Sequence, residues 1–183
     1  METFITKPAD SLSDDQLLFG RDQAIAQFTW ARQYTLQLLE ATPRELWYQL
    51  PSGATTHVAW QVGHLAVSQY GLLLFRQRGR AEGDLELMPG WLRKQFGRGT
   101  TPAASSAGQP TADDLLARLD AIHARALEEL PHATADQLRE PIDMPYAAYP
   151  IKLGALVFCP IHEAIHAGQI GLLRRLHGLE PVR

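Results

Sequence analysis

The chain has 183 residues, 45% of them hydrophobic, and its 17 Lys and Arg against 20 Asp and Glu give a formal net charge of −3. This length suits one domain over residues 1–183, and the slight negative charge gives no electrostatic reason to expect a nucleic-acid partner. A single cysteine, no secretory pattern at the N-terminus and no apolar stretch as long as a bilayer predict a cytoplasmic protein without disulfides or membrane contact.

The first long helix is predicted from Asp14 to Glu40. Ser13 and Gln16 have the spacing of a capping box, in which each side chain bonds the backbone of the other residue. Apolar residues then recur at helical spacing up to the end of this segment. Thr42 and Pro43 favour a second, short helix with Thr42 as its cap.

A second long helix is predicted from about Thr56 to Arg78. The following stretch, residues 79–110, is poorly periodic, and a loop of this length is often a lid or a binding loop. Trp91 and Phe96 indicate that its first half packs on the domain. Residues 100–109 are small and polar and favour a mobile segment.

The third long helix is predicted from Thr111 to Leu130, where Pro131 stops it, and a short turn of helix follows over residues 134–138. After a proline-rich connector, the last helix runs from about Lys152 to His177, with Pro160 expected to kink it. Four long helices without alternating strands predict an all-α four-helix bundle, with a long loop between helices two and three.

His162 and His166 form the strongest functional pattern. They lie at positions i and i+4 of one helix, so their side chains leave nearly the same face. That spacing lets two imidazoles bind one ion at roughly 2.0–2.1 Å. The alternative is two polar residues at the edge of the core, each bonded to a backbone group.

His64 is the candidate for a third ligand. It lies in the middle of the second helix, after Gly63, whose missing side chain permits a close approach by another group. An antiparallel arrangement of the second and last helices would face His64 toward the other two histidines, although His64 as a lone interior histidine is the alternative. His57 lies seven residues earlier; we interpret it as a solvated residue, with a fourth ligand or a proton shuttle as the alternative.

Residues 162–166 also match H-E-x-x-H, the zinc protease motif, in which the glutamate acts as general base. Only a short tail follows His166, which leaves no room for a downstream helix with a third ligand. A zinc protease is therefore the least favoured hypothesis. Glu163 is a candidate catalytic base at the metal. The alternative is that Glu163 orients a histidine or pairs with Arg32 or Arg174.

Gln169 shares the face of the two last-helix histidines, since it lies three residues after His166 and seven after His162. We predict that it stands behind the site and orients a ligand or a bound water. The remaining histidines, His123, His132 and His177, are interpreted as surface or helix-end residues.

Three segments resemble the DinB-like, YfiT-like proteins. Residues 60–66, WQVGHLA, are similar to their second-helix motif. Residues 162–170, HEAIHAGQI, are similar to their last-helix motif, and residues 96–100, FGRGT, resemble the loop before helix three.

This resemblance implies an up-down-down-up four-helix bundle, often a homodimer. It also implies a divalent metal, commonly zinc or nickel, held by His64, His162 and His166. Members of the family include thiol S-transferases that use low-molecular-weight thiols such as bacillithiol or mycothiol, thiol-dependent isomerases, and proteins described as metal-dependent hydrolases.

The leading hypothesis is therefore a metal-dependent enzyme. It would act as a thiol S-transferase or a hydrolase on a small electrophilic substrate, with a low-molecular-weight thiol as the co-substrate of the transferase form. Three protein ligands leave a coordination position open, which is the arrangement of a catalytic zinc site. The alternatives are a non-enzymatic metal-binding or stress-related module, and a plain bundle whose histidines are structural.

Overall fold

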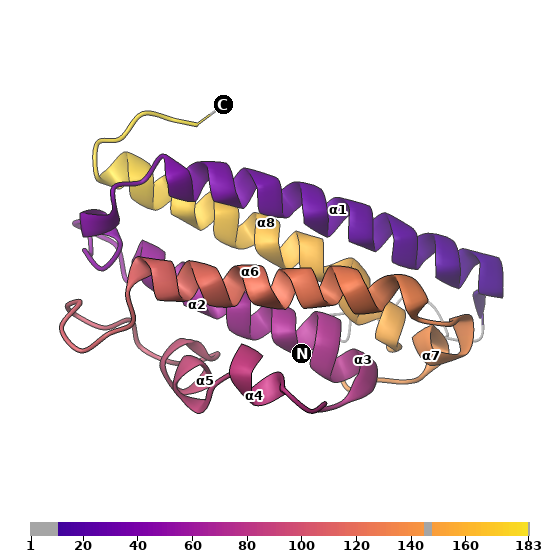
Figure 1. Cartoon of the computed structure of the whole chain (residues 1–183). Coiled ribbons are helices and arrows are strands. Elements are labelled where there is room, and N and C mark those ends of the chain that lie inside the picture. The colour runs from indigo at the N-terminus through magenta and orange to yellow at the C-terminus, as the bar shows by residue number, and fades with distance from the viewer. Residues whose placement is uncertain (1–10, 145–147, 183) are drawn as a thin grey trace.

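The computed structural model describes residues 11–144 and 148–182, and four long helical segments dominate it (Figure 1). These are α1 (Asp14–Glu40), α2 (Val58–Gln69) with its continuation through η3 (Tyr70–Phe75) and α3 (Arg76–Arg78), α6 (Ala112–Glu129), and α8 (Lys152–Leu176). Helices α1 and α8 run in one direction, and α2 and α6 run in the other (Figure 1). The predicted all-α bundle with up-down-down-up topology is confirmed.

The connections carry short helical elements. These are η2 (Arg44–Leu46), α4 (Asp84–Leu87), α5 (Gly90–Phe96), η4 (Leu130–His132) and α7 (Ala135–Arg139). The loop between the second and third long helices therefore contains two short helices, and Phe96 at the end of α5 is buried, as its aromatic character predicts. Residues 1–10, residues 145–147 of the predicted connector, and residue 183 lie outside the described residues.

The predicted cap of α1 is confirmed, and α6 begins with the same kind of cap, which was not predicted. Ser13 and Gln16 make the reciprocal hydrogen bonds of a capping box before α1. Thr111 and Asp114 make the same pair before α6. Each box satisfies backbone N–H groups that the first turn of a helix leaves without a partner.

Thr42 does not cap a helix, so that prediction is wrong. Its hydroxyl donates to the carbonyl oxygen of Leu38 at 2.6 Å, one turn back in α1, and the side chain is buried. The chain then forms only the 3₁₀ turn η2 after Pro43, with no side-chain cap. A buried threonine hydroxyl commonly bonds to the carbonyl four residues earlier, and this removes it from the capping position.

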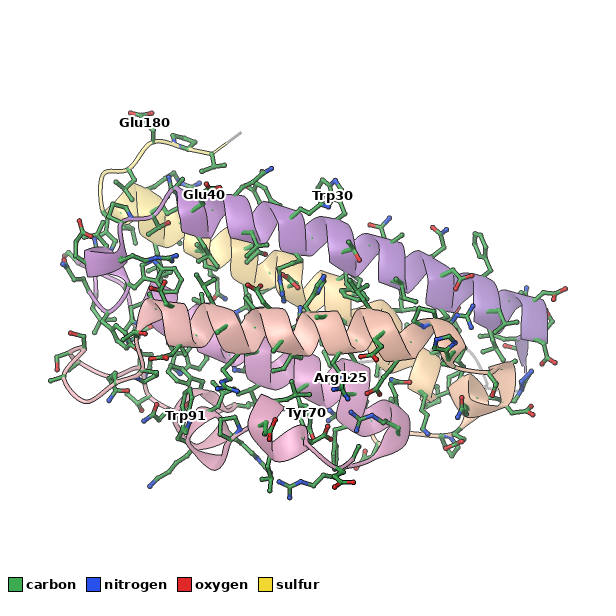
Figure 2. The ribbon with its side chains drawn as sticks, in the orientation of Figure 1. Trp30, Glu40, Tyr70, Trp91, Arg125 and Glu180 are labelled. Atoms are coloured by element: carbon green, nitrogen blue, oxygen red, sulfur yellow. The ribbon has the colours of Figure 1, made fainter. Side chains whose placement is uncertain are left out.

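Helices α1 and α8 pack along each other in parallel. Near their C-terminal ends, the buried Arg174 guanidinium of α8 donates to the carbonyl oxygen of Leu38, to that of Ala41 and to the hydroxyl of Thr42. The outer side of α1 is exposed, and Trp30 projects from it with 67% of its surface accessible (Figure 2). The parallel pairing places the middle of α8 between α1 and α2.

Within the described residues, α8 is the one helix whose length and apolar composition would also allow it to cross a membrane. It runs unbroken through Pro160, although the proline supplies no backbone donor. Its two buried charged side chains, Glu163 and Arg174, have partners on α1. One face of the helix packs in the core, but only 39% of its apolar window is buried, and Ile161, Ile165, Leu172 and Leu176 are exposed.

Candidate metal centre

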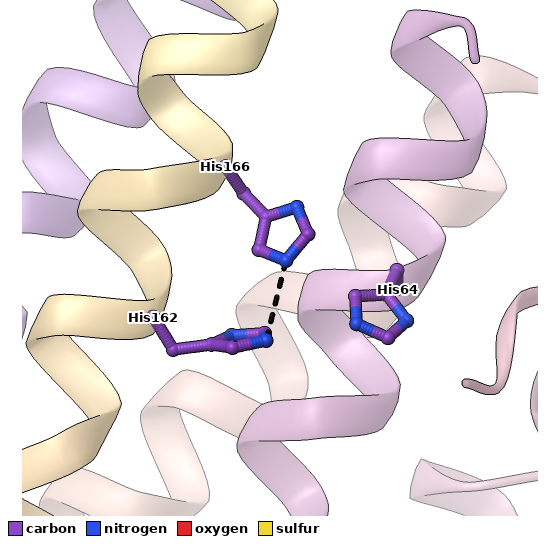
Figure 3. A group of neighbouring side chains, drawn as sticks. All are labelled: His64, His162 and His166. Atoms are coloured by element: carbon purple, nitrogen blue, oxygen red, sulfur yellow. Dashed lines mark hydrogen bonds between the residues drawn. The ribbon is translucent and has the colours of Figure 1, made fainter. Parts of the chain in front are cut away.

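Three histidines from two antiparallel helices converge at one point of the bundle. His64 comes from α2, and His162 and His166 come from α8, with all three rings turned toward the space between the helices (Figure 3). One ring nitrogen from each residue lies within 4.8 Å of the others. The Nε2 atoms of His162 and His166 are 3.2 Å apart.

These separations fit a single divalent ion. Two imidazole nitrogens at 2.0–2.1 Å from a tetrahedral ion lie roughly 3.3–3.4 Å from each other. The α8 pair, at 3.2 Å, is close to this spacing. Two ligands of one ion are at most about 4.2 Å apart at these bond lengths, and the 4.8 Å limit on the separations within the triad lies close to that value.

His64 is oriented by the last residue of α5 and by a ring on its own helix. Its Nδ1–H donates to the carbonyl oxygen of Phe96 at 2.8 Å, so the lone pair lies on Nε2. Nε2 accepts a long hydrogen bond from the hydroxyl of Ser68 at 3.3 Å, and an ion would replace this bond. The indole of Trp60 stacks on the imidazole, with ring centroids 4.7 Å apart and planes within 6°. Metal-binding histidines usually donate their second ring N–H to a carbonyl or carboxylate in this way.

His166 is oriented by an amide on the opposite helix. Its Nδ1–H donates to Oε1 of Gln61 at 2.5 Å, and the Gln61 amide nitrogen donates in turn to the hydroxyl of Thr56 at 2.9 Å. Gln61 is buried, so this chain of bonds fixes both the tautomer and the plane of the imidazole. Nε2 of His166 is thereby directed at His162 and the ion position.

Burial keeps the three histidines in the form that binds metal. Loss of hydration lowers the pKa of His162 to about 4 and that of His166 to about 3, and neighbouring imidazoles add to both effects. Burial also lowers the pKa of His64, against the opposing effect of the Phe96 carbonyl. A neutral imidazole is the ligand form, so no proton has to leave near neutral pH before metal binds.

Glu163 faces away from this centre, toward α1. It is fully buried, and its Oε1 accepts from Nε of Arg32 at 2.8 Å. The amide of Gln69 donates to its other oxygen and accepts from the Arg32 guanidinium at 2.5 Å. Arg32 also donates to the carbonyl of Leu119 on α6, so this buried cluster joins all four long helices.

The match to known protein families agrees with this geometry. The family model of the DinB superfamily matches residues 27–170, which include all three histidines. The chain belongs to the DinB superfamily. A search of curated proteins found no significant match.

Gln169, in the part of α8 that carries the DinB-like motif, is exposed, and the bond to the ring of His166 comes from Gln61. Sequence reasoning missed two glutamines of α2, Gln61 and Gln69. Both are buried amides in a helix without charged residues, and such amides need partners. Their position in an apolar helix is the signal that could have identified them.

The expectation that His57 is solvated is wrong. The residue is buried at the start of α2, where Nδ1 accepts from the backbone N–H of Trp60 and Nε2–H donates to the carbonyl of Ala103. Because both ring nitrogens are engaged, His57 has no lone pair left for a fourth metal bond. Its role is to cap α2 and to hold the loop at Ala103.

The other histidines lie outside the centre. His132 is exposed in η4 and His177 caps the C-terminal end of α8, as predicted. His123 is half-buried, in contrast to the prediction of a surface residue. Its ring meets that of Phe28 edge-on at 5.0 Å, and burial together with the charge of Arg32 lowers its pKa to about 4.

Replacing Gly63 with alanine is expected to disturb the His64 side of the centre. A Cβ at this position would overlap the ring of Phe96, with Cδ2 at 2.8 Å, so Phe96 and its carbonyl must shift. Overpacking of this kind typically lowers the free energy of unfolding by about 1–3 kcal/mol. Urea denaturation measures the change.

Gly171→Ala is the matched control, because the added Cβ would meet Leu38 at an ordinary 3.9 Å. In a helix interior, glycine to alanine stabilises by about 0.5–1 kcal/mol. If Gly63→Ala were as stable as Gly171→Ala, the close packing of Phe96 on α2 would be refuted.

Replacing Gln61 with leucine is expected to weaken metal binding. The substitution keeps the size of the side chain and removes the acceptor that orients His166. Loss of such an orienting partner usually lowers metal affinity by about 10–100-fold. Zinc affinity is measured by competition with a chelating dye.

Gln169→Leu provides the comparison, since that amide is exposed on α8. We expect wild-type affinity for this variant. A loss of affinity in Gln169→Leu with none in Gln61→Leu would show that Gln169, and not Gln61, orients the ligand histidine.

Proposed function

We propose that this protein is a metal-dependent thiol S-transferase that acts on a small electrophilic substrate. The observation that carries the proposal is the convergence of His64, His162 and His166, whose ring nitrogens lie within 4.8 Å of one another. A divalent metal such as zinc or nickel, held by three imidazoles with one position open, lowers the pKa of a coordinating thiol or water.

The position of Glu163 favours thiol transfer over hydrolysis. A hydrolase of this kind would use Glu163 as the base that takes a proton from water. Both carboxylate oxygens are already engaged, one with Arg32 and the other with Gln69, and the side chain is fully buried. A thiol is far more acidic than water and needs no protein base once a metal has lowered its pKa further.

Other residues of the chain position the ligand histidines and shield one of them from solvent. Phe96 and Gln61 fix the rings of His64 and His166, and Trp60 covers one face of His64. A zinc protease is the weaker alternative, since the glutamate of its motif is the ion-paired Glu163. A cytoplasmic location, a homodimer, a small-molecule substrate, and the absence of nucleic-acid and membrane partners stay predictions from the sequence.

The test is conjugation of monobromobimane to a panel of low-molecular-weight thiols, with zinc- or nickel-loaded protein. We expect turnover that requires metal, is lost in His64→Ala and is retained in His132→Ala, a histidine outside the centre. Metal-dependent cleavage of esters or amides without thiol transfer would replace the proposal with a hydrolase. Metal binding without either activity would replace it with a non-enzymatic metal-binding module.

A further inference from the structure

Aromatic side chains border the metal centre on both helices that form it. On α2, Trp60 stacks on His64, and its indole N–H donates to the hydroxyl of Thr100 at 2.9 Å, which fixes the ring. On α8, the ring centroid of Phe158 lies 5.7 Å from that of His162. Both aromatic residues are half-buried, so part of each is accessible beside the site.

Two isoleucines extend this border along α8. Ile161 and Ile165 each directly precede a ligand histidine, and they lie at positions i and i+4, so they share one face of the helix. They are 54% and 51% exposed, whereas His64 and His166 are only 9% and 7% exposed. The rim formed by these large apolar side chains is thus far more exposed than His64 and His166.

This rim has no charge of its own. Between Glu45 and Arg76, the segment that contains all of α2 has no Asp, Glu, Lys or Arg. Between Lys152 and Arg174 the single charged residue is Glu163, which is fully buried and paired with Arg32. A charged group of a ligand would find no complementary charge on these helices beside the open metal position.

We propose that the centre binds a small, uncharged ligand with an apolar body. The metal-binding head of the ligand reaches the ion held by the three histidines, and its hydrocarbon part packs in a collar formed by Trp60, Phe158, Ile161 and Ile165. This assignment rests on the proposed function and names the substrate class of that site. The burial of His64 and His166, which are 9% and 7% exposed, favours a narrow molecule over a second copy of the chain, whose surface would cover the isoleucines without reaching the ion.

The experiment is calorimetric titration of the zinc-loaded full chain with straight-chain hydroxamic acids of two to eight carbons. These probes are neutral near pH 7 and bind zinc through the same head. We expect affinity to rise with chain length, by up to about fourfold for each CH₂ that the collar buries. A probe of equal length that ends in a carboxylate is expected to bind more weakly than its uncharged counterpart.

Ile165→Asn is expected to flatten the dependence on chain length while leaving the affinity of the two-carbon probe unchanged. Leu176→Asn is the matched control, since Leu176 is 47% exposed on the same helix but lies almost three turns beyond His166. It should keep the wild-type dependence. Equal flattening in both variants would overturn the assignment of the collar.

Other outcomes separate this inference from the function on which it rests. Tight binding of all probes with no effect of chain length would refute the proposed collar but would still support the metal centre. A protein that takes up no zinc would overturn the metal centre and, with it, the inference. If light scattering shows that Ile165→Asn converts a dimer into a monomer, a second copy covers the isoleucines and the small-ligand assignment is wrong.

Discussion

Replacing Glu163 with alanine is expected to lower the free energy of unfolding by about 3–5 kcal/mol. The substitution leaves the Arg32 guanidinium, 2% exposed, without its carboxylate in the core. An uncompensated buried charge costs far more than the lost contact itself, because the guanidinium cannot regain its hydration. Urea denaturation followed by circular dichroism gives the value.

Glu128→Ala is the control for this prediction. Glu128 pairs with Arg125 on the surface of α6 and its side chain is 74% exposed, so its removal should change stability by less than about 1 kcal/mol. A loss below about 1 kcal/mol for Glu163→Ala as well would show that the buried ion pair does not form.

Replacing His166 with alanine is expected to lower zinc affinity by more than about 100-fold. Loss of a partner that only orients a ligand already lowers affinity by about 10–100-fold, and loss of the ligand itself should exceed that. His166 is central to the triad, since its Nε2 lies 3.2 Å from that of His162 and its ring centroid lies 4.9 Å from that of His64. Competition with a chelator of known affinity measures the change.

The matched control is His132→Ala, which removes an exposed imidazole outside the centre and should bind zinc as the wild type does. Circular dichroism of each variant verifies that the bundle is folded. If folded His166→Ala keeps zinc affinity within threefold of the wild type, His166 is not a ligand.

Local signals in the sequence predict the fold well. The capping box at Ser13 marks the start of α1 because both of its partners lie within four residues. The same local reasoning fails at Thr42. Its hydroxyl has two possible partners within one turn, and burial against Arg174 decides between them. That contact joins distant parts of the chain, so no local pattern contains it.

The sequence predicts the three histidine ligands of the candidate metal centre, but only some of the residues that surround them. The spacing of His162 and His166 reflects one helix, so it is visible in the sequence. The residues that orient the ligands come from other helices. Helical spacing along α8 therefore suggested Gln169 as the partner of His166, whereas the partner in the structure is Gln61 of α2. The pairing of Glu163 with Arg32 was among the alternatives, but its burial depends on how α1 packs against α8.

The central claim is that one divalent ion binds to His64, His162 and His166. The most direct test is a crystal structure of the zinc-loaded full chain, with anomalous scattering measured on both sides of the zinc edge. We predict one zinc ion with a nitrogen of each of the three imidazoles at roughly 2.0–2.1 Å and at least one further position facing solvent. A zinc ion bound elsewhere, or one that contacts fewer than three of these histidines, would contradict the claim.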